Sequence, residues 1–282
     1  LVHEAALFAV AEAIVGHPDA AVIYTDHDHV NPDGQFLDPH MKPDWNPDLL
    51  SSMDYFGALT AYRSDMWKAH ATAEKSAHGL ALGATSGLNP GQVVHVPQVL
   101  VSKRVSGDGS HLIPATVRVV RRLPQPPPKV SVIIPTRDQG RMLERCLTTL
   151  REGTDYPHLE LVVVDHETTE KKALKVLDDL SQRTNTQIIK FSGPFNFAAM
   201  VNRGVEVATG RILVLLNNDT EIVDPSWLAE LVTEVVRPEV GIVGAMLLFG
   251  DETVQHAGVH PGVAGLMGHG HKHRSVNDPG YF

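Results

Sequence analysis

The sequence has few of the residues that crosslink a chain, span a membrane or bind nucleic acid. It contains a single cysteine, Cys146, which excludes a disulfide within the chain and favours a reducing compartment. No run of eighteen apolar residues occurs, so we expect no transmembrane helix. Basic residues number 24 against 33 acidic ones, and the net charge of −9 disfavours nucleic acid as a partner.

Two glycine-rich phosphate-binding motifs are also missing. No GxGxxG follows the first strong strand pattern, which argues against a dinucleotide site, and no GxxxxGK[ST] occurs anywhere, which argues against a P-loop hydrolase. The 282 residues suffice for one large or two modest domains, and their 43% hydrophobic content is that of a globular protein. Because the sequence begins without Met and inside a predicted helix, we expect a fragment of a longer protein.

The clearest pattern lies between Lys129 and Glu221. Three apolar runs, VSVIIPT, LELVVVD and RILVLL, predict buried strands that start near residues 130, 159 and 211. Leucines at helical spacing separate the first two runs, and a second leucine-rich helix, a short strand QIIKF and a helix over about 198–208 precede the third. This alternation predicts a mostly parallel, doubly wound α/β sheet with flanking helices.

Polar side chains follow each of these strands. Thr136 and Asp138 follow the first, Asp165 ends the second, and the third leads into Asn217, Asn218 and Asp219. Open α/β sheets bind ligands at the carboxyl ends of their strands. With acids there and no glycine-rich cradle, a diphosphate held through Mg²⁺ or Mn²⁺ is the expected ligand, because these cations use few carboxylates together with phosphate oxygens.

The motifs VSVIIPTRD, LVVVDHETT, FNFAAMVNRG and ILVLLNNDTE, in this order, resemble the nucleotide-sugar-binding half of a family 2 glycosyltransferase with the Rossmann-like GT-A fold. The resemblance implies a nucleotide-binding set and a metal-binding set. The nucleotide-binding residues it implies are Pro135, Thr136, Asp138, Asp165, Asn202, Arg203 and Asn218. It makes Asp219 the metal ligand, and Asn217 stands as a weaker ligand where an aspartate is usual.

The first part of the chain resembles the acceptor-side, C-terminal half of the same tandem-domain bacterial enzymes, which build surface polysaccharides. The segments YTDHDHV and KPDWNPDLL carry this likeness. Where these enzymes have an acidic block with the general base, this chain has Ala77, His78 and Gly79. His78 is a weak candidate for the base, and a solvent-facing histidine is the favoured interpretation. For Asp26 and Asp28, strand-ending acids are favoured over a metal site.

A proline-rich segment, RRLPQPPPK, marks the predicted domain boundary. We expect an incomplete acceptor-side half over 1–120, a stiff linker over 121–128 and the nucleotide-sugar-binding half over 129–282. Beyond residue 221, Asp224 and Pro225 predict the start of a helix, and VGIVGAMLLF predicts another buried strand. The histidines from His256 to His273 favour a loop near the substrate over a metal site.

The functional hypothesis is metal-assisted, inverting transfer of a sugar from a nucleotide-diphospho-sugar to a polysaccharide or lipid-linked acceptor. Inversion follows from the resemblance alone. Because the base motif is missing, a non-catalytic nucleotide-sugar or glycan-binding module is the alternative, and a nucleotidyltransferase is a weaker one. We expect a cytoplasmic location. Peripheral association with the inner face of the membrane, through the rest of the protein, is an open alternative.

Overall fold

The computed structural model describes residues 1–72, 74, 76–105, 119–262 and 267–278. The chain divides into two compact units, one up to Val120 and one that covers Arg121–Asp278. Parts of the predicted halves, namely 106–118, 263–266 and 279–282, lie outside the described residues. No helix in the described ranges is both long and apolar enough to cross a membrane.

The first unit is a mixed sheet with helices around it. Its elements are α1 (Ala6–Gly16), β1 (Val22–Val30), β2 (Phe36–His40), α2 (Pro47–Ser52), β3 (Thr60–Tyr62), α3 (Ser64–His70), α4 (Ala77–Thr85), a 3₁₀ turn (Pro90–Gln92) and β4 (Val93–Arg104). Strand β1 is buried along its whole length except at His29, because β4 pairs with it in parallel and β2 and β3 pair with it in antiparallel orientation. The apolar runs VIYT and VVHVPQVLV thus lie in β1 and β4.

The second unit contains the predicted parallel sheet. Its elements are β5 (Val130–Thr136), α5 (Gly140–Glu152), β6 (Leu159–His166), α6 (Lys171–Ser181), β7 (Thr186–Phe191), α7 (Phe197–Val205), β8 (Ile212–Leu215), α8 (Trp227–Val235), β9 (Leu247–Leu248), β10 (Val254–His256), β11 (Val259–Pro261) and β12 (Met267–His269). The sheet order is β7-β6-β5-β8, and all neighbours are parallel. The predicted α/β class is thereby confirmed.

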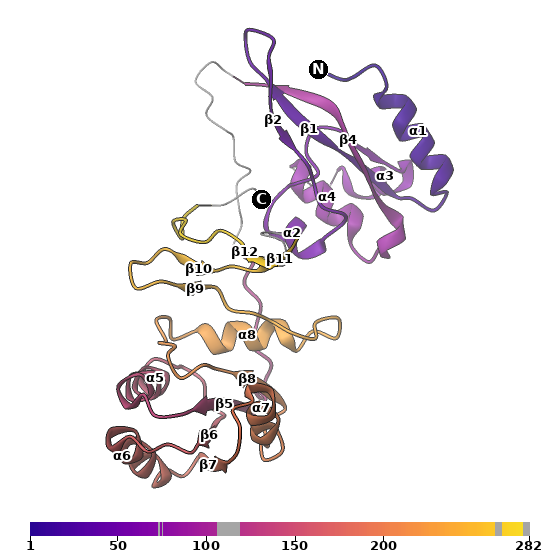
Figure 1. The fold of residues 1–282 in the computed structure, drawn as a ribbon. Coiled ribbons are helices and arrows are strands. Elements are labelled where there is room, and N and C mark those ends of the chain that lie inside the picture. The colour runs from indigo at the N-terminus through magenta and orange to yellow at the C-terminus, as the bar shows by residue number, and fades with distance from the viewer. Residues whose placement is uncertain (73, 75, 106–118, 263–266, 279–282) are drawn as a thin grey trace. The chain divides into compact units, whose positions relative to one another are not determined.

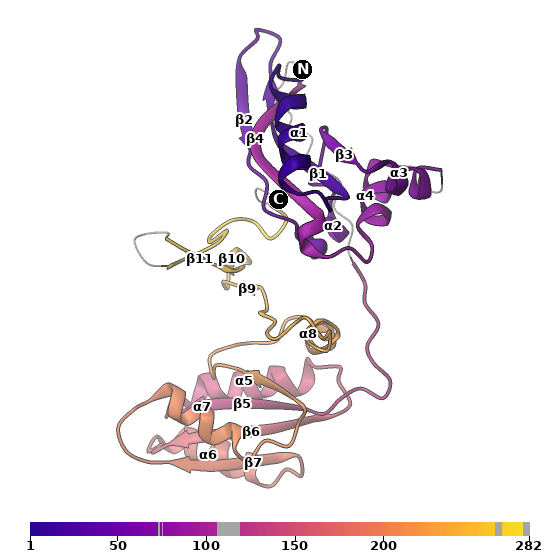
Figure 2. The same cartoon turned by 90° about the vertical axis from the view of Figure 1, so that its right-hand side faces the viewer.

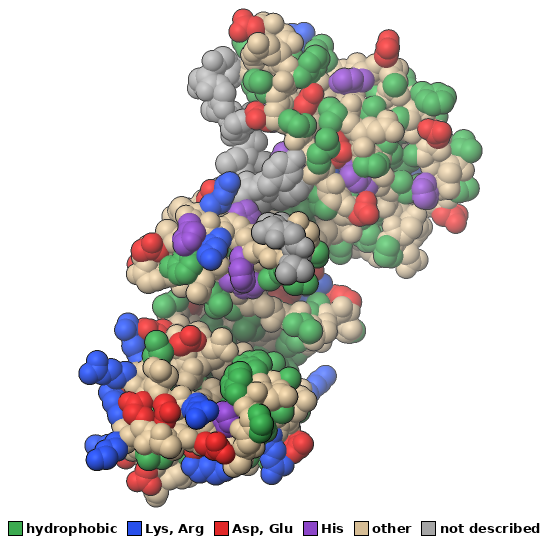
Figure 3. All heavy atoms as spheres, in the orientation of Figure 1, with side chains coloured by type: hydrophobic (Ala, Val, Ile, Leu, Met, Phe, Trp, Pro, Cys, Tyr) green, Lys and Arg blue, Asp and Glu red, His purple; other side chains and the backbone are tan. Residues whose placement is uncertain are grey.

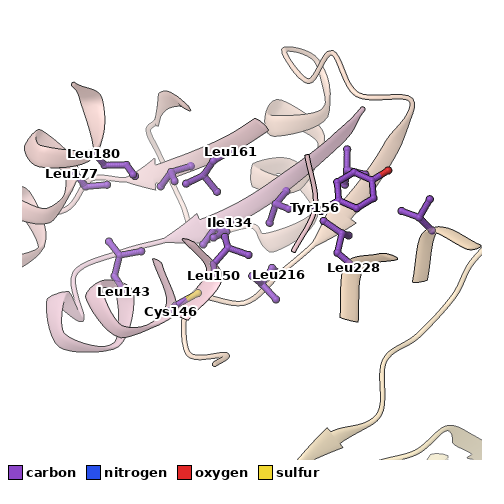
Figure 4. Close-up of a cluster of buried hydrophobic side chains, with 14 residues drawn as sticks. Ile134, Leu143, Cys146, Leu150, Tyr156, Leu161, Leu177, Leu180, Leu216 and Leu228 are labelled. Atoms are coloured by element: carbon purple, nitrogen blue, oxygen red, sulfur yellow. The ribbon is translucent and has the colours of Figure 1, made fainter. Parts of the chain in front are cut away.

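Helices cover both faces of this sheet, with α5 and α6 on one side and α7 on the other (Figures 1 and 2). Alternate residues of one strand supply the two cores: Ile134 packs with Leu143, Leu150 and Leu228 (Figure 4), whereas Ile133 packs with Met200 of α7. Because both faces of the sheet are buried, the strands have unbroken apolar sequences.

A buried carboxylate joins the strands at the amino end of the sheet. Glu160 of β6 accepts hydrogen bonds from Ser131 of β5 and from the backbone N–H and hydroxyl of Thr209, and it pairs with Lys129. Burial by itself would raise the pKa of Glu160, but the hydrogen bonds from Lys129, Ser131 and Thr209 outweigh it and lower the pKa to about 2. Glu160 therefore stays ionised and ties β5, β6 and the turn before β8 together.

The proline-rich segment packs against the second unit. The Tyr156 hydroxyl donates to the carbonyl of Pro128 (2.6 Å), Arg121 pairs with Glu234 of α8 (2.8 Å), and Leu123 lies against the core. The segment contains no helix or strand, as expected of a proline-rich stretch.

The prediction of a buried strand over VGIVGAMLLF is wrong. Only Leu247 and Leu248 are in a strand, which pairs with β10, and the Ile242 side chain is 91% exposed. An apolar run becomes a buried strand only where another layer covers it, and Ile242 has no such cover within the described chain.

The close packing of α7 on the sheet gives a stability prediction. A Cβ at Gly204 would lie 2.5 Å from Ile133 Cγ2. Overpacking costs about 1–3 kcal/mol, whereas helix propensity gains about 1 kcal/mol for Gly→Ala. We expect Gly204→Ala to lower the free energy of unfolding by up to about 2 kcal/mol in urea titrations. Gly16→Ala is the control, since nothing lies within 4 Å of that helical position, and equal stability of the two variants would contradict the packing argument.

Candidate functional site

The carboxyl edge of the parallel sheet brings several predicted residues into one row. Thr136 of β5 is the register partner of Asp165 in β6, and Asp165 is the partner of Lys190 in β7. From the other side, Asn218 Nδ2 donates to Thr136 Oγ1 at 2.9 Å. The chain after β8 is thus joined to the end of β5. Pro135, one residue earlier, is half-buried and pairs with Val164.

Asp165 is fully buried and already bonded. Its carboxylate accepts a hydrogen bond from the backbone N–H of Thr168 (3.0 Å) and pairs with the Lys190 ammonium. Burial alone would raise the pKa of Asp165, but the bonds from Lys190 and Thr168 outweigh it, and the pKa lies below its usual value. The structure therefore makes Asp165 the residue that shapes the turn after β6 and fixes Lys190.

Asp138 holds two loops together. Its Oδ1 atom accepts from the backbone N–H groups of Thr169 (2.7 Å) and Glu170 (2.8 Å), and these bonds lower its pKa. In return, the Asp138 N–H donates to Thr168 Oγ1 (3.1 Å). Asp138 and Gln139 both have positive φ, 51° and 53°, so the reciprocal bonds hold a backbone conformation that is uncommon for residues other than glycine.

His166 is a candidate site residue that the sequence motifs did not indicate. It is 1% exposed at the end of β6, its Nε2 atom lies 2.8 Å from the Gly193 carbonyl, and its buried Nδ1 atom has no hydrogen-bond partner among the described residues. Phe191 and Phe195 flank the ring, with centroids at 5.7 and 5.9 Å. Because a carbonyl only accepts, Nε2 carries the hydrogen, and in the neutral ring Nδ1 is an acceptor.

The segment after β8 carries the predicted metal ligands. Asn217 and Asp219 are exposed, while the Asn217 carbonyl accepts from Thr220 N (3.3 Å) and lies 3.6 Å from the Cys146 sulfur. Burial first, and then the charge of Asp219, raise the pKa of the Cys146 thiol to about 11. Cys146 is therefore a buried core residue, as expected.

The donor set here suits a cation that binds mainly through a ligand. In the described ranges, no three His, Cys, Asp or Glu side chains gather in a way that could hold a metal. Asp219 and Asn217 offer one exposed carboxylate and one exposed amide. That pair fits Mg²⁺ or Mn²⁺, which take one or two protein oxygens and complete their shell with phosphates and water.

Two predicted residues on α7 face solvent. Asn202 and Arg203 are exposed, and Arg203 pairs with Glu206. The adjacent Gly204 sits on Ile133 and Val164, so this turn of the helix covers the middle of the sheet. The structure therefore does not bring Asn202 and Arg203 into the row formed by Thr136, Asp165 and Asn218.

In the first unit, His78 lies in α4 and its Nε2 atom is 2.5 Å from the Leu50 carbonyl. It is half-buried, so the expectation of a solvent-facing histidine is wrong, and the contact ties α4 to α2. Asp26 is 1% exposed and accepts from Lys42 N and His95 Nε2, both at 2.8 Å. These bonds favour a structural role for Asp26, but the expectation that Asp26 and Asp28 end a strand is wrong, because both lie within β1, which continues to Val30.

The later histidines lie on short hairpins. The Nδ1 atoms of His256 in β10 and His269 in β12 are 2.8 Å apart, and the His273 ring stacks on Phe249 with centroids at 4.7 Å. Two rings that share a hydrogen bond and a third that stacks elsewhere do not make a tetrahedral ligand set.

Comparison with known proteins identifies the family. Residues 131–271, half of the chain, match the model of the Glycosyl transferase family 2. The chain belongs to this family. The match includes every residue of the carboxyl-edge row, so the candidate site lies within the family-matched region.

Two relatives align with almost the whole chain. The O-antigen biosynthesis protein RfbC of Myxococcus xanthus is 34% identical over 94% of this chain and 23% of its own length. The uncharacterized protein y4gI of Sinorhizobium fredii is 31% identical over 98% of this chain and 35% of its own length. The chain thus spans about a quarter to a third of these curated relatives.

Solved structures of glycosyltransferases are also similar to this chain. The mannosyltransferase PcManGT of Pyrobaculum calidifontis, in complex with GDP-Man and Mn²⁺, is 29% identical, with a TM-score of 0.37 over 40% of this chain and 34% of that one. TarS of S. aureus (residues 1–349) is 19% identical, with a TM-score of 0.35 over 46% of this chain and 41% of that one. Both TM-scores are below 0.5.

The Asp165–Lys190 pair gives a pH prediction for this glycosyltransferase unit. With Lys190 replaced by Gln, burial should raise the pKa of Asp165 above its value in the natural protein, as followed by carboxyl ¹³C NMR. In the natural protein the pKa of Asp165 is lower when the chain is folded than when it is unfolded. The ionised carboxylate therefore stabilises the fold above pH 3.8, the pKa in the unfolded chain, and this stabilisation is lost as the pH falls through the pKa in the folded protein. In Lys190→Gln this contribution to stability should be smaller, and its loss on acidification should be complete at a higher pH.

The matched control is Lys171→Gln, an exposed lysine at the start of α6. It should leave the Asp165 titration unchanged. An unaltered Asp165 pKa in Lys190→Gln would show that the ion pair does not hold the carboxylate ionised.

Proposed function

We propose that the second unit binds a nucleotide-diphospho-sugar at the carboxyl edge of its sheet and serves a glycosyltransferase that extends a polysaccharide or a lipid-linked glycan. The observation that carries this proposal is the bond from Asn218 to Thr136, which joins the segment after β8 to the end of β5 within the family-matched region. The relative named as an O-antigen biosynthesis protein supports a glycan acceptor.

The row of strand ends supports separate places for the two parts of the donor. On one side, His166 offers a buried, unpartnered Nδ1 acceptor between aromatic rings, which suits a nucleoside. On the other side, Asn218 and Asp219 lie on the segment that would face the diphosphate. Asp165 and Asp138 serve this site by holding its loops, since their oxygens already accept backbone hydrogen bonds.

We also propose that Asp219, with Asn217 as the weaker partner, holds a divalent cation, Mg²⁺ or Mn²⁺. When bound, the cation would supply positive charge to the leaving diphosphate. The protein's own contribution is to place the exposed Asp219 next to Asn218, whose amide is bonded to Thr136 at the end of β5. Direct displacement with inversion is the reaction that the family resemblance implies.

Donor binding without appreciable transfer is proposed for this chain alone. General-base assistance typically contributes about 10²–10⁴-fold, and the position expected for the base is occupied by Ala77, His78 and Gly79, of which His78 already bonds a backbone carbonyl. A module that binds a nucleotide sugar without transferring it is therefore the second candidate function, in the cytoplasm in either case.

Replacement of Asp219 tests the metal proposal. Titration calorimetry with UDP, GDP or dTDP should show tighter binding in the presence of Mn²⁺, and Asp219→Ala should lose that gain, about tenfold or more in Kd if one charged contact is removed. Asn217→Ala should have a smaller effect. Asp178→Ala, which removes an exposed acid on α6, is the control. Full metal-dependent binding by Asp219→Ala would refute the assignment.

Two replacements of His166 test the nucleoside proposal, because Asn places a polar group near the former Nδ1 position and Gln places one near the former Nε2 position. Gln should keep the bond to Gly193 but weaken nucleotide binding about fivefold, the size expected for one neutral hydrogen bond. Asn should retain more affinity. Both effects should appear with and without Mn²⁺, and equal affinity of the Gln variant and the natural protein would contradict the role of Nδ1.

A further inference from the structure

Residues 241–246 of the second unit form an apolar segment that belongs to no helix or strand, between α8 and β9 (Figures 1 and 2). The side chains of Ile242 and Met246 are 91% and 52% exposed. Within the described ranges, the backbone of this segment makes no hydrogen bond to another backbone group. The segment leads directly into β9, which pairs with β10. We call residues 241–246 the open segment.

The first unit contains a counterpart of the open segment. In both units a helix is followed by a proline and then by an apolar stretch, and four positions match in sequence at identical spacing. The matching pairs are Ala9 and Ala229, Val15 and Val235, Pro18 and Pro238, and Val22 and Ile242. Helix α8 and the open segment therefore correspond to α1 and the start of β1.

Strands lie on both sides of this counterpart. β4 pairs with the start of β1 in parallel, with Val22 opposite Val93, and β3 pairs with it in antiparallel orientation. Val22 is fully buried as a result, whereas Ile242, at the matching place in the second unit, is almost fully exposed. The two places are both apolar in sequence, and they differ in the strands beside them.

We propose that the open segment is the docking site of an added β-strand of the β4 type, a valine-rich polypeptide segment that pairs with it in parallel. Such a strand would supply partners for the backbone of the open segment and cover Ile242 and Met246. A Cβ built on Gly244 would meet no atom within 4 Å, so the space beside the segment is open. The proposal concerns a protein-binding surface and does not rest on the donor site.

A peptide with the sequence of β4, Val93–Arg104, is the probe for this site. The test titrates it into the whole chain and follows the amide signals of residues 242–246 by ¹⁵N NMR. We expect saturable shifts of these signals, and amide hydrogen exchange in the segment should slow about fivefold or more, the size expected for one backbone hydrogen bond. A peptide of the same composition in scrambled order should leave both measurements unchanged.

Proline variants test whether the backbone of the open segment makes the pairing. Proline has no N–H to donate, and the N–H groups of successive residues in a strand point to opposite edges. Of Gly244→Pro and Ala245→Pro, at least one should therefore weaken peptide binding about tenfold or more. Gly244→Ala keeps the N–H and is the matched control, which should bind like the natural protein. Unchanged signals of Gly204 and Gly210, which pack against the sheet, report that the second unit is still folded.

Three results would overturn the proposal independently of one another. They are the absence of a saturable shift with the β4 peptide, equal binding of the scrambled peptide, and binding by both proline variants that is as tight as that of the natural protein. Signals of the open segment that shift with protein concentration before peptide is added would show that a second copy of the chain pairs there, and this too would overturn it.

Discussion

The ionised carboxylate of Glu160 is the constraint on which the second unit depends. It sits at the amino end of the sheet and accepts hydrogen bonds from β5 and from the turn before β8, while Lys129 neutralises its charge. A slip of one residue in any of these strands would exchange their two faces and would leave this buried charge without donors. The register of the strands is thus fixed at the end of the sheet opposite the functional edge.

That register decides which side chains meet at the carboxyl edge. Thr136, Asp165 and Lys190 lie side by side because their strands are parallel and aligned, and Asn218 reaches the same row from β8. Alternation along β6 then sends Asp165 and His166 to opposite faces. Asp165 organises the turn after β6, and the His166 ring lies near Phe191 and Phe195. On the face seen in Figure 3, charged residues of both signs lie on the surface of this unit.

Much of the second unit could be predicted from its sequence, because unbroken apolar runs and leucines at helical spacing carry clear periods. The four parallel strands, the helices α5 to α8 and the polar strand ends could all be predicted in this way, whereas the short strands β9 to β12 could not. The roles of individual side chains were less readable. Sequence does not show that the oxygens of Asp138 and Asp165 are occupied by backbone donors, or that His166 is buried with an unpartnered nitrogen. The exposure of Ile242 could not be foreseen either, since burial depends on a covering layer.

The proline-rich segment has a practical consequence for anyone who wishes to isolate the second unit. Although its composition resembles a spacer, Leu123 lies against the hydrophobic core, Pro128 accepts the Tyr156 hydroxyl, and Arg121 pairs with α8. A polypeptide that began at the first strand would lose all three attachments and expose apolar surface on the helix side of the sheet. A start at or before Arg121 preserves them, so the stable unit is longer than its recognisable motifs.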